Sequence, residues 1–390
     1  MLPQDLLSEA KEQTDVAIQH RRALHAMAET GFDLPKTTEY IKKALQKAGL
    51  SPRVFGACGV IADIPCSRAD AKTILLRADA DALPIKEESG LPFAAENGNM
   101  HACGHDMHAA MLLSAVPLLL RYRSHLSCHV RLMFQGAEEI LGGAYRMLAQ
   151  GAADGVSAAF SLHVLSDSPF PTGDVLLPPS GAAAPEAAFF RIEIQGKGGH
   201  GALPEDCVDA LRVAALTVPV LLSRPFGPVT LSLGNLQAGR AANVLPDAAL
   251  LSGTVRSLKE GALVSALNEM EKSARGVAGA FDARATLSVT SRCPCLMIDE
   301  AMREKGKRVF SALLGEESVH SMTQASGASE DFAFISEKCP SLTVALSAGR
   351  REDGYAFPLH HPRALFDEGA LPYGAALYAA FALGLAEGDL

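Results

Sequence analysis

The sequence predicts an α/β fold, in which a largely parallel sheet with helices on both faces carries a second, smaller α+β domain. Three observations lead to this prediction. The first part of the chain alternates strand-like apolar runs with helical patterns. These strands are apolar along nearly their whole length, as strands buried on both faces of a parallel sheet are. Near residue 177 the pattern changes to strands that alternate apolar and polar residues, and it changes back near residue 297.

Length, charge and composition narrow the class of protein. A chain of 390 residues exceeds what one hydrophobic core usually covers, which favours two domains. The net charge is −9 and no basic block occurs, so we expect no binding to nucleic acid or to a membrane. The first residues lack the charged-then-apolar pattern of a signal peptide, so we expect none there, and the apolar stretch near the C-terminus favours a buried helix over a membrane span. With eight scattered cysteines, the chain is expected in the reducing cytoplasm.

The elements of the main domain follow in order. Residues 5–49 have helical patterns that end at Gly49, a suitable helix C-cap. The next strands are "GVIADIP", "TILLRADADALPI", "HVRLMFQGAEE" and "AAFSLHV". Helical patterns such as "HAAMLLSAVPLLLRYR" and "GGAYRMLAQG" fall between them. After "CPCLMID" come a helix, the strand "SLTVALSAG" and a last helix. This alternation predicts a three-layer αβα arrangement.

The middle of the chain predicts the second domain. The segment "LPPSGAAAPE" is typical of a linker by its Pro, Gly and Ala content. After it, strands and helices follow in the order β-α-β-β-α-β, from "AFFRIEIQG" to "DARATLSVTS", which is the order of a ferredoxin-like unit. We therefore expect the main domain to comprise residues 1–183 and 297–390, with a ferredoxin-like domain inserted at residues 184–296.

Side chains able to bind metal follow several of the predicted strands. Open α/β sheets build their sites at the carboxyl ends of parallel strands, so these side chains are expected to meet. Two divalent cations need a mixture of carboxylates and imidazoles, and adjacent glutamates can divide coordination and proton transfer between them. The candidates are Asp79, Asp81, Cys103, His105, Asp106, Glu138, Glu139, His163, His360 and His361.

Each candidate also has a simpler explanation. A glutamate pair is usually a solvated surface, and a lone histidine after an apolar strand is usually a core residue. The stretch "HACGHDMHAA" alone fits a zinc knuckle or a reactive cysteine as well as half of a catalytic metal site. A knuckle would need a second Cys/His pair at finger-like spacing, and none follows. The joint pattern at several strand ends therefore favours a metal site.

Segments spread over nearly the whole chain resemble one known family. They include "LLRADADALPI", "HACGHDMHAAMLL", "GAEEILGGAYRML", "GKGGHGALPEDCVDAL", "ANVLPDAALLSGTVR", "SEDFA" and "PLHHPRALFDEGAL". As a set they resemble the hippurate hydrolase, or N-acyl-L-amino-acid amidohydrolase, family of dinuclear metallopeptidases. The indole-acetyl-amino-acid hydrolases belong to that family, and aminoacylases and carboxypeptidases are more distant relatives. The resemblance implies a phosphorylase/hydrolase-like main domain with an inserted lid and dimerisation domain.

The resemblance also implies roles for individual residues. It implies that two divalent metal ions (zinc, manganese, nickel or cobalt) bind to Cys103, His105, Glu139, His163 and His360. It implies that Glu138 is the general base and that Asp81 orients a ligand histidine. His360, and not His361, occupies the family's ligand position. Asp106 aligns with a metal-bridging aspartate of the distant relatives, and its role here stays open.

In the inserted domain, the resemblance implies that His200 stabilises the oxyanion, in its own active site or in that of a partner. It implies that Asn243 and Arg256 bind a substrate carboxylate. A homodimer through this domain is expected, since the strand "PVTLSLGNLQ" could pair at a sheet edge.

The function implied is hydrolysis of the amide bond of N-acyl amino acids (acetyl, aromatic or other acyl), releasing a carboxylate and a free amino acid. The expected mechanism uses a metal-bridged water and Glu138. A dipeptidase or carboxypeptidase acting at the same site is one alternative, and a binding module without catalysis is another. Gly136 and Ala28 stand where the family mostly has proline, and such departures bear on the substrate.

Overall fold

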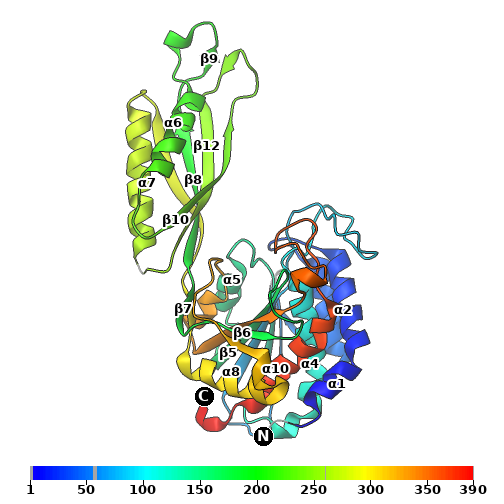
Figure 1. Ribbon diagram of the computed structural model, residues 1–390. Coiled ribbons are helices and arrows are strands. Elements are labelled where there is room, and N and C mark those ends of the chain that lie inside the picture. The colour runs from blue at the N-terminus through cyan, green and yellow to red at the C-terminus, as the bar shows by residue number, and fades with distance from the viewer. Residues whose placement is uncertain (1–2, 56–58, 260, 390) are drawn as a thin grey trace. The chain divides into compact units, whose positions relative to one another are not determined.

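The computed structural model describes residues 3–55, 59–259 and 261–389. The chain divides into two compact units. Unit 1 comprises Met1–Ala183, Leu296–Ala325 and Glu330–Leu390, and unit 2 comprises Ala184–Cys295 and Ser326–Ser329. Figure 1 labels many of their elements.

Unit 1 is built on an eight-stranded sheet with the strand order β1-β2-β4-β3-β5-β16-β6-β15. The pairs β4–β3, β3–β5, β5–β16 and β6–β15 are parallel, whereas β1–β2, β2–β4 and β16–β6 are antiparallel. The prediction of a largely parallel sheet is therefore confirmed. The strands are β1 (Arg53–Val54), β2 (Gly59–Ile64), β3 (Thr73–Asp79), β4 (His129–Gln135), β5 (Val156–Leu165), β6 (Val175–Leu177), β15 (Val319–Ser321) and β16 (Ser341–Ser347).

Two long apolar helices pack on the centre of this sheet. Helix α4 (His105–Arg121) contacts β3 and β5, and α10 (Leu371–Gly384) contacts α4 and β5. Almost every residue of α10 is buried, which explains why this helix is apolar on all sides. No helix within the described ranges is long and apolar enough to cross a membrane. The other helices are α1 (Leu6–Glu12), α2 (Thr14–Met27), α3 (Pro35–Lys47), α5 (Gly143–Ala149), α8 (Glu300–Leu314) and α9 (Ala333–Ser336).

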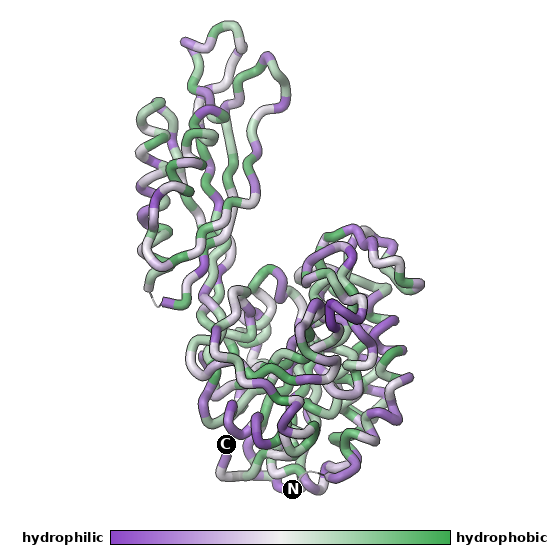
Figure 2. The backbone as a smooth tube through the Cα atoms, in the orientation of Figure 1, coloured by the Kyte–Doolittle hydropathy of each residue, from purple (hydrophilic) through white to green (hydrophobic). Residues whose placement is uncertain are grey.

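The hydropathy of unit 1 follows this layering. The strands of the sheet are mostly apolar, and the outer turns of the helices carry hydrophilic residues (Figure 2). In β3, for example, every residue after Thr73 is buried. Two of those residues, Arg77 and Asp79, are charged, so the interior of the sheet contains ion pairs as well as apolar side chains.

The predicted linker is partly a strand. Residues Gly181–Ala184 form β7, which pairs with β14 (Leu296–Ile298) in a two-stranded sheet. The segment predicted as a linker thus contains the division between the units at Ala183 and Ala184, and four of its residues also pair as a strand. Their hydrogen-bond partner lies more than a hundred residues further along the chain, and local composition cannot reveal it.

Unit 2 is a four-stranded antiparallel sheet with the order β10-β12-β8-β13. Helices α6 and α7 contact each other and this sheet, and the residues between them form a separate hydrophobic core. Along β8, Phe190, Ile192 and Ile194 are buried, while the residues that alternate with them are exposed. A short pair, β9 (Gly199–His200) with β11 (Val244–Leu245), extends from the sheet. The other elements are β8 (Glu186–Gln195), α6 (Ala210–Ser223), β10 (Thr230–Ala238), β12 (Ala248–Ser257), α7 (Ala262–Gly279) and β13 (Arg284–Cys293).

Candidate metal centre

Side chains from four segments of unit 1 meet near the carboxyl end of its sheet. Cys103 Sγ lies 3.4 Å from His163 Nε2 and 3.2 Å from His360 Nε2. Glu139 Oε2 lies 3.5 Å from His360 Nε2, and Glu139 Oε1 lies 3.8 Å from His105 Nε2. The structure thus brings together the five side chains for which the sequence predicts a ligand role. We call Cys103, His105, Glu139, His163 and His360 the donor cluster.

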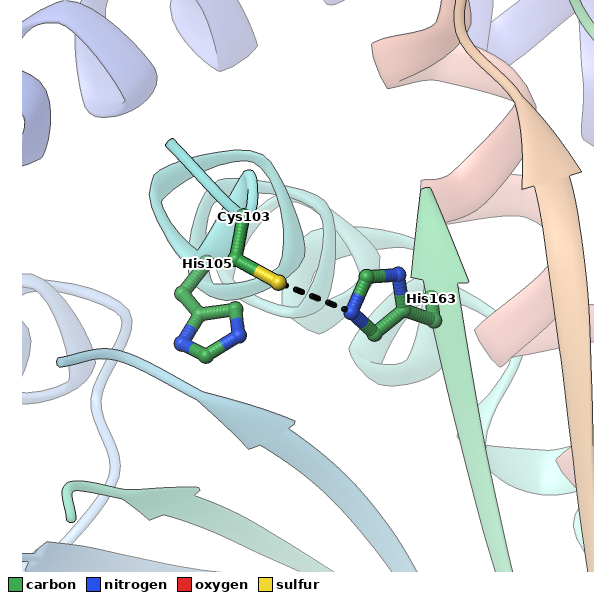
Figure 3. A group of neighbouring side chains, drawn as sticks. All are labelled: Cys103, His105 and His163. Atoms are coloured by element: carbon green, nitrogen blue, oxygen red, sulfur yellow. Dashed lines mark hydrogen bonds between the residues drawn. The ribbon is translucent and has the colours of Figure 1, made fainter. Parts of the chain in front are cut away.

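The beginning of α4 places two of these donors. The thiol of Cys103 and the imidazoles of His105 and His163 point toward one another, from the start of α4 and from β5 (Figure 3). Gly104 lies between Cys103 and His105 with φ +81°, a conformation that L side chains rarely adopt. This left-handed residue precedes the first turn of the helix and allows both neighbours to face the same space.

Three further residues of the site have left-handed backbone conformations. Ala137 (φ +58°) and Leu141 (φ +53°) flank the glutamate pair, and His360 itself has φ +66°. Such conformations cost free energy in residues other than glycine and gather at functional sites. The loop after β4 and the loop that carries His360 are therefore held in shapes that serve the site.

Two atoms of the donor cluster are buried without a hydrogen-bond partner among the described residues, His105 Nε2 and Glu139 Oε1. The other nitrogen of His105 donates to the backbone carbonyl of Asp81 at 3.0 Å. A buried polar atom without a partner is unfavourable, and a cation between these atoms would satisfy both. A thiol, three imidazoles and a carboxylate are also donors that divalent transition metals accept. The residues present therefore fit a metal site.

Asp81 accepts hydrogen bonds from three residues of the site. Its carboxylate accepts hydrogen bonds from the backbone N–H groups of Glu138 (3.0 Å) and Glu139 (3.2 Å). Its carbonyl accepts the hydrogen bond from His105, as described above. One residue therefore fixes both the glutamate loop and the orientation of an imidazole of the donor cluster.

Glu138 is buried beside the donor cluster, with an oxygen 4.0 Å from His105 Nε2. Burial, and after it the charges of Glu330, Asp331 and Glu139, raise the pKa of Glu138 well above its ordinary value. The other oxygen of Glu138 accepts a hydrogen bond from the backbone N–H of Asp331 at 3.3 Å. A held carboxylate with a raised pKa is suited to accept and return a proton.

Burial shifts the pKa values of several side chains of the donor cluster. Burial, together with the charge of Glu139, raises the pKa of the Cys103 thiol well above its ordinary value. Burial likewise raises the pKa of Glu139 to about 7. Burial, with the neighbouring His108, lowers the pKa of His163 to about 3, so this imidazole keeps a free lone pair. Binding of a cation would therefore release protons from Cys103 and Glu139.

Asp106, whose role the sequence leaves open, lies away from the donor cluster. Its Oδ2 accepts hydrogen bonds from Arg21 Nε (3.1 Å) and His25 Nδ1 (2.9 Å) of α2, and His25 Nε2 contacts Glu87 at 3.0 Å. This carboxylate fastens α4 to α2. His361 also lies outside the cluster, where its ring stacks on Phe357 with centroids 4.4 Å apart.

Buried side chains around Arg77 form a hydrogen-bonded group. The sequence analysis assigned no role to several of its members. Arg77 donates to Asp79 (2.6 Å), to Gln135 (3.0 Å) and to Asp331 (2.8 Å), and His108 contacts Asp79 at 2.5 Å. One signal for this group is present in the sequence. A charged arginine in the middle of the apolar strand "TILLRAD" must find buried acceptors.

The candidates in unit 2 have a different environment. His200 and Asn243 are exposed, and they lie together because β9 pairs with β11 and Gly201 N–H donates to the Asn243 carbonyl at 2.9 Å. Arg256 lies at the other end of β12, where it pairs with Ala187, whereas Ala248 at the start of β12 pairs with Gln195. At the usual rise per strand residue, these ends are about 26 Å apart. Within one chain, Arg256 and Asn243 are therefore not brought together.

Comparisons with known proteins agree with this site. The model of the peptidase family M20/M25/M40 matches residues 75–384. The chain is 35% identical over 377 residues to the N-acetylcysteine deacetylase of Bacillus subtilis, covering 94% of this chain and 96% of that protein. It is 31% identical over 394 residues to thermostable carboxypeptidase 2 of Saccharolobus solfataricus, covering 98% of each chain.

A solved structure gives the same result. The chain is similar to a dinuclear metal-binding peptidase of family M20 from Bacillus subtilis, with a TM-score of 0.76 and 32% sequence identity, over 96% of this chain and 98% of that one. The resemblance predicted from the sequence motifs is therefore confirmed. The chain belongs to peptidase family M20/M25/M40 and is a metal-dependent hydrolase.

Proposed function

We propose that this chain hydrolyses the amide bond of N-acyl amino acids at the donor cluster of unit 1, releasing a carboxylate and a free amino acid. The observation that carries the proposal is the donor cluster itself, with two unsatisfied buried atoms next to the buried carboxylate of Glu138. The names of relatives, among them an N-acetylcysteine deacetylase, support an acyl amino acid as substrate.

Two divalent metal ions bound there would polarise the substrate carbonyl and lower the pKa of a water molecule. Cys103, His105, Glu139, His163 and His360 would hold these ions. A thiolate with imidazoles favours zinc, nickel or cobalt, and the carboxylate also admits manganese.

Glu138 accepts the proton of the attacking water and returns it to the nitrogen of the leaving amine. Its buried position and raised pKa suit both steps, since the same group must bind the proton and then give it up. Asp81 keeps Glu138 in place through the backbone N–H bond at 3.0 Å. The chain's own contribution to catalysis is therefore a positioned base in a buried site.

Unit 2 supplies substrate contacts in this proposal. His200 donates a hydrogen bond to the oxyanion, and Asn243 and Arg256 bind the substrate carboxylate. The length of β12 between Arg256 and the β9–β11 pair supports contributions from two chains to one substrate, because one carboxylate cannot span it.

A homodimer through unit 2 would provide such sites. Strand β10 is an edge strand of the unit 2 sheet, and an unpaired edge can pair with a second copy. Helix α6 exposes apolar side chains that a partner would cover. These are Leu211, Leu216, Val220 and Leu222.

We place the protein in the cytoplasm, where its thiols stay reduced, and none of the seven described cysteines forms a disulfide.

A carboxypeptidase or dipeptidase activity at the same site is the second candidate. The similarity to a thermostable carboxypeptidase over nearly the whole chain favours it. Both candidates use the same donor cluster and the same base, and they differ in the group on the amine side of the scissile bond.

A screen of purified full-length protein separates these candidates. Acetyl, benzoyl and longer acyl amino acids are compared with dipeptides and acyl dipeptides, each with added zinc, manganese, cobalt or nickel. The proposal expects the highest kcat/KM on an acyl amino acid. Higher values on peptides would select the second candidate, and metal binding without turnover on any substrate would indicate a binding module.

A further inference from the structure

His108 lies on α4 one turn after His105, and both histidines are fully buried. Residues three apart on a helix face the same way, so helix geometry alone does not distinguish them. Their hydrogen bonds do. His105 Nε2 has no hydrogen-bond partner among the described residues, whereas both nitrogens of His108 are occupied.

The partners of His108 fix its tautomer. Its Nε2 accepts a hydrogen bond from the backbone N–H of Val164 at 2.8 Å, so this nitrogen carries no proton. Its Nδ1 therefore carries the proton and donates to Asp79 Oδ1 at 2.5 Å. The second oxygen of Asp79 accepts from Arg77 Nη1 at 2.6 Å. Both oxygens of Asp79 thus have a hydrogen-bond partner, and His108 has no lone pair left for a metal ion.

Val164 is where this chain of contacts meets the donor cluster. Strand β3 pairs with β5 only as far as Arg77 with Ser161, so Val164 lies beyond the end of that ladder. The His108 side chain takes the place of the missing backbone acceptor. The carbonyl of Val164 in turn accepts from Nδ1 of His163 at 2.7 Å, which leaves Nε2 of His163 facing Cys103.

We propose that Arg77, Asp79 and His108 form a positioning relay that holds β5 at Val164 and so orients His163 for metal binding. The relay sets how tightly the metal ion at Cys103 and His163 is bound. This inference rests on the proposed function, since it assigns a partner to a proposed metal ligand. Groups that orient metal-bound histidines typically change metal affinity by about 10- to 100-fold.

The test uses the full-length chain, stripped with a chelator and titrated with Co²⁺ in competition with a chelator of known affinity. The absorption of the Co²⁺–thiolate bond reports on the ion next to Cys103. His108→Ala removes both contacts. His108→Asn can still donate to Asp79 but is too short to accept from Val164, and His108→Gln can reach Val164. The melting temperature of each metal-free variant is measured in parallel.

The relay predicts a loss of Co²⁺ affinity of about 10- to 100-fold and an altered thiolate band in His108→Ala and His108→Asn, with a smaller loss in His108→Gln. His320→Gln is the matched control. It breaks another histidine–aspartate pair of the same sheet, His320 with Asp174 at 2.7 Å, and should leave Co²⁺ binding unchanged.

A purely structural role for His108 would lower the melting temperature and leave Co²⁺ affinity and the thiolate band as in the wild type, and this result would overturn the inference. If His108→Ala does not fold, His108→Asn and Asp79→Asn decide in the same way. Wild-type protein that binds no Co²⁺ would contradict the proposed function itself, which separates the two failures.

Discussion

The donor cluster of unit 1 and the β9–β11 loops of unit 2 carry the same kinds of side chains in opposite environments. In unit 1, His105 and Glu139 are held by buried partners, and each keeps one atom unsatisfied. In unit 2, His200 and Asn243 are exposed to solvent. Water satisfies exposed polar groups at little cost, whereas buried unsatisfied ones are costly. The first region is therefore organised for a cation in advance, whereas solvent satisfies the exposed polar groups of the second.

The largest effect is expected from Glu138 in unit 1. Glu138→Gln removes the proton acceptor and should lower kcat by about 10²- to 10⁴-fold. Metal content, measured by elemental analysis, should stay as in the wild type, because Glu138 is not among the proposed ligands. The control is Glu337→Gln, which changes an exposed glutamate at the C-terminal end of α9. Near-normal turnover in Glu138→Gln would refute the assignment of the base.

The next effect is expected from His200 in unit 2. His200→Ala should lower kcat by about 10²- to 10³-fold, since it removes one donor to the oxyanion. Metal content and melting temperature should not change, because the side chain is exposed. A kcat within a factor of two of the wild type would remove His200 from the mechanism.

Mixing the two inactive variants shows whether His200 acts across a dimer. If it acts on the partner's site, a mixture of refolded Glu138→Gln and His200→Ala chains regains about a quarter of the wild-type activity, because half of the chains are in mixed dimers and each mixed dimer has one intact site. Activity that stays at the level of the separate variants would show that His200 acts within its own chain.

The buried His25 of unit 1 should make stability depend on pH. Burial opposes the charge of His25, but Asp106 and Glu87 outweigh it and raise the pKa of His25 to about 9. A raised pKa stabilises the fold fully below pH 6.5, and this contribution is lost as pH rises through 9. It amounts to at most about 3 kcal/mol.

His25→Gln should therefore reduce the free energy of unfolding at pH 6 and flatten its decrease between pH 6.5 and 9, measured by urea unfolding. Parallel curves for wild type and His25→Gln would contradict the charged state of this buried histidine.

Cys103→Ser replaces a soft donor of the cluster by a hard one. Affinity for at least one Zn²⁺ ion should fall by about 10-fold or more, measured by competition with a chelator. Cys66→Ser is the matched control, since Cys66 is also buried but donates to the Arg68 carbonyl. Unchanged binding of both ions in Cys103→Ser would argue against a thiolate ligand.

The smallest effect is expected from Asn243. Asn243→Ala should raise KM by about 10-fold, in line with the loss of one hydrogen bond to a charged group, and change kcat less. The difference from wild type should disappear with a substrate whose carboxylate is amidated. An equal effect on both substrates would show that Asn243 contacts another part of the substrate.

The sheet could be predicted because strand ends can be recognised from apolar runs, and these ends supplied several of the candidates. The resemblance to a known family implied the five members of the donor cluster, and atoms of residues as far apart as Cys103 and His360 lie 3.2 Å apart. What could not be predicted is which polar atoms find a partner. His105 and His108 belong to one motif, and their hydrogen bonds distinguish them. Nε2 of His108 accepts from Val164 N–H, whereas Nε2 of His105 has no partner among the described residues.

Two other features could not be predicted from the sequence for the same reason. Gly181–Ala184 is a strand because β14 lies beside it, which composition does not show. Arg256 and Asn243 follow each other closely in one sequence motif, but the extended strand β12 separates them. In both cases, distance along the sequence does not indicate which residues are neighbours, because the tertiary structure decides it.

The central claim is that the donor cluster of unit 1 holds two metal ions that hydrolysis requires. The most direct test titrates chelator-stripped protein with Zn²⁺ or Mn²⁺ and follows, in the same samples, bound metal and hydrolysis of an acyl amino acid. The account predicts no turnover in stripped protein and full activity when two equivalents are bound. Full turnover without metal, or saturation of the protein with metal before any hydrolysis appears, would contradict it.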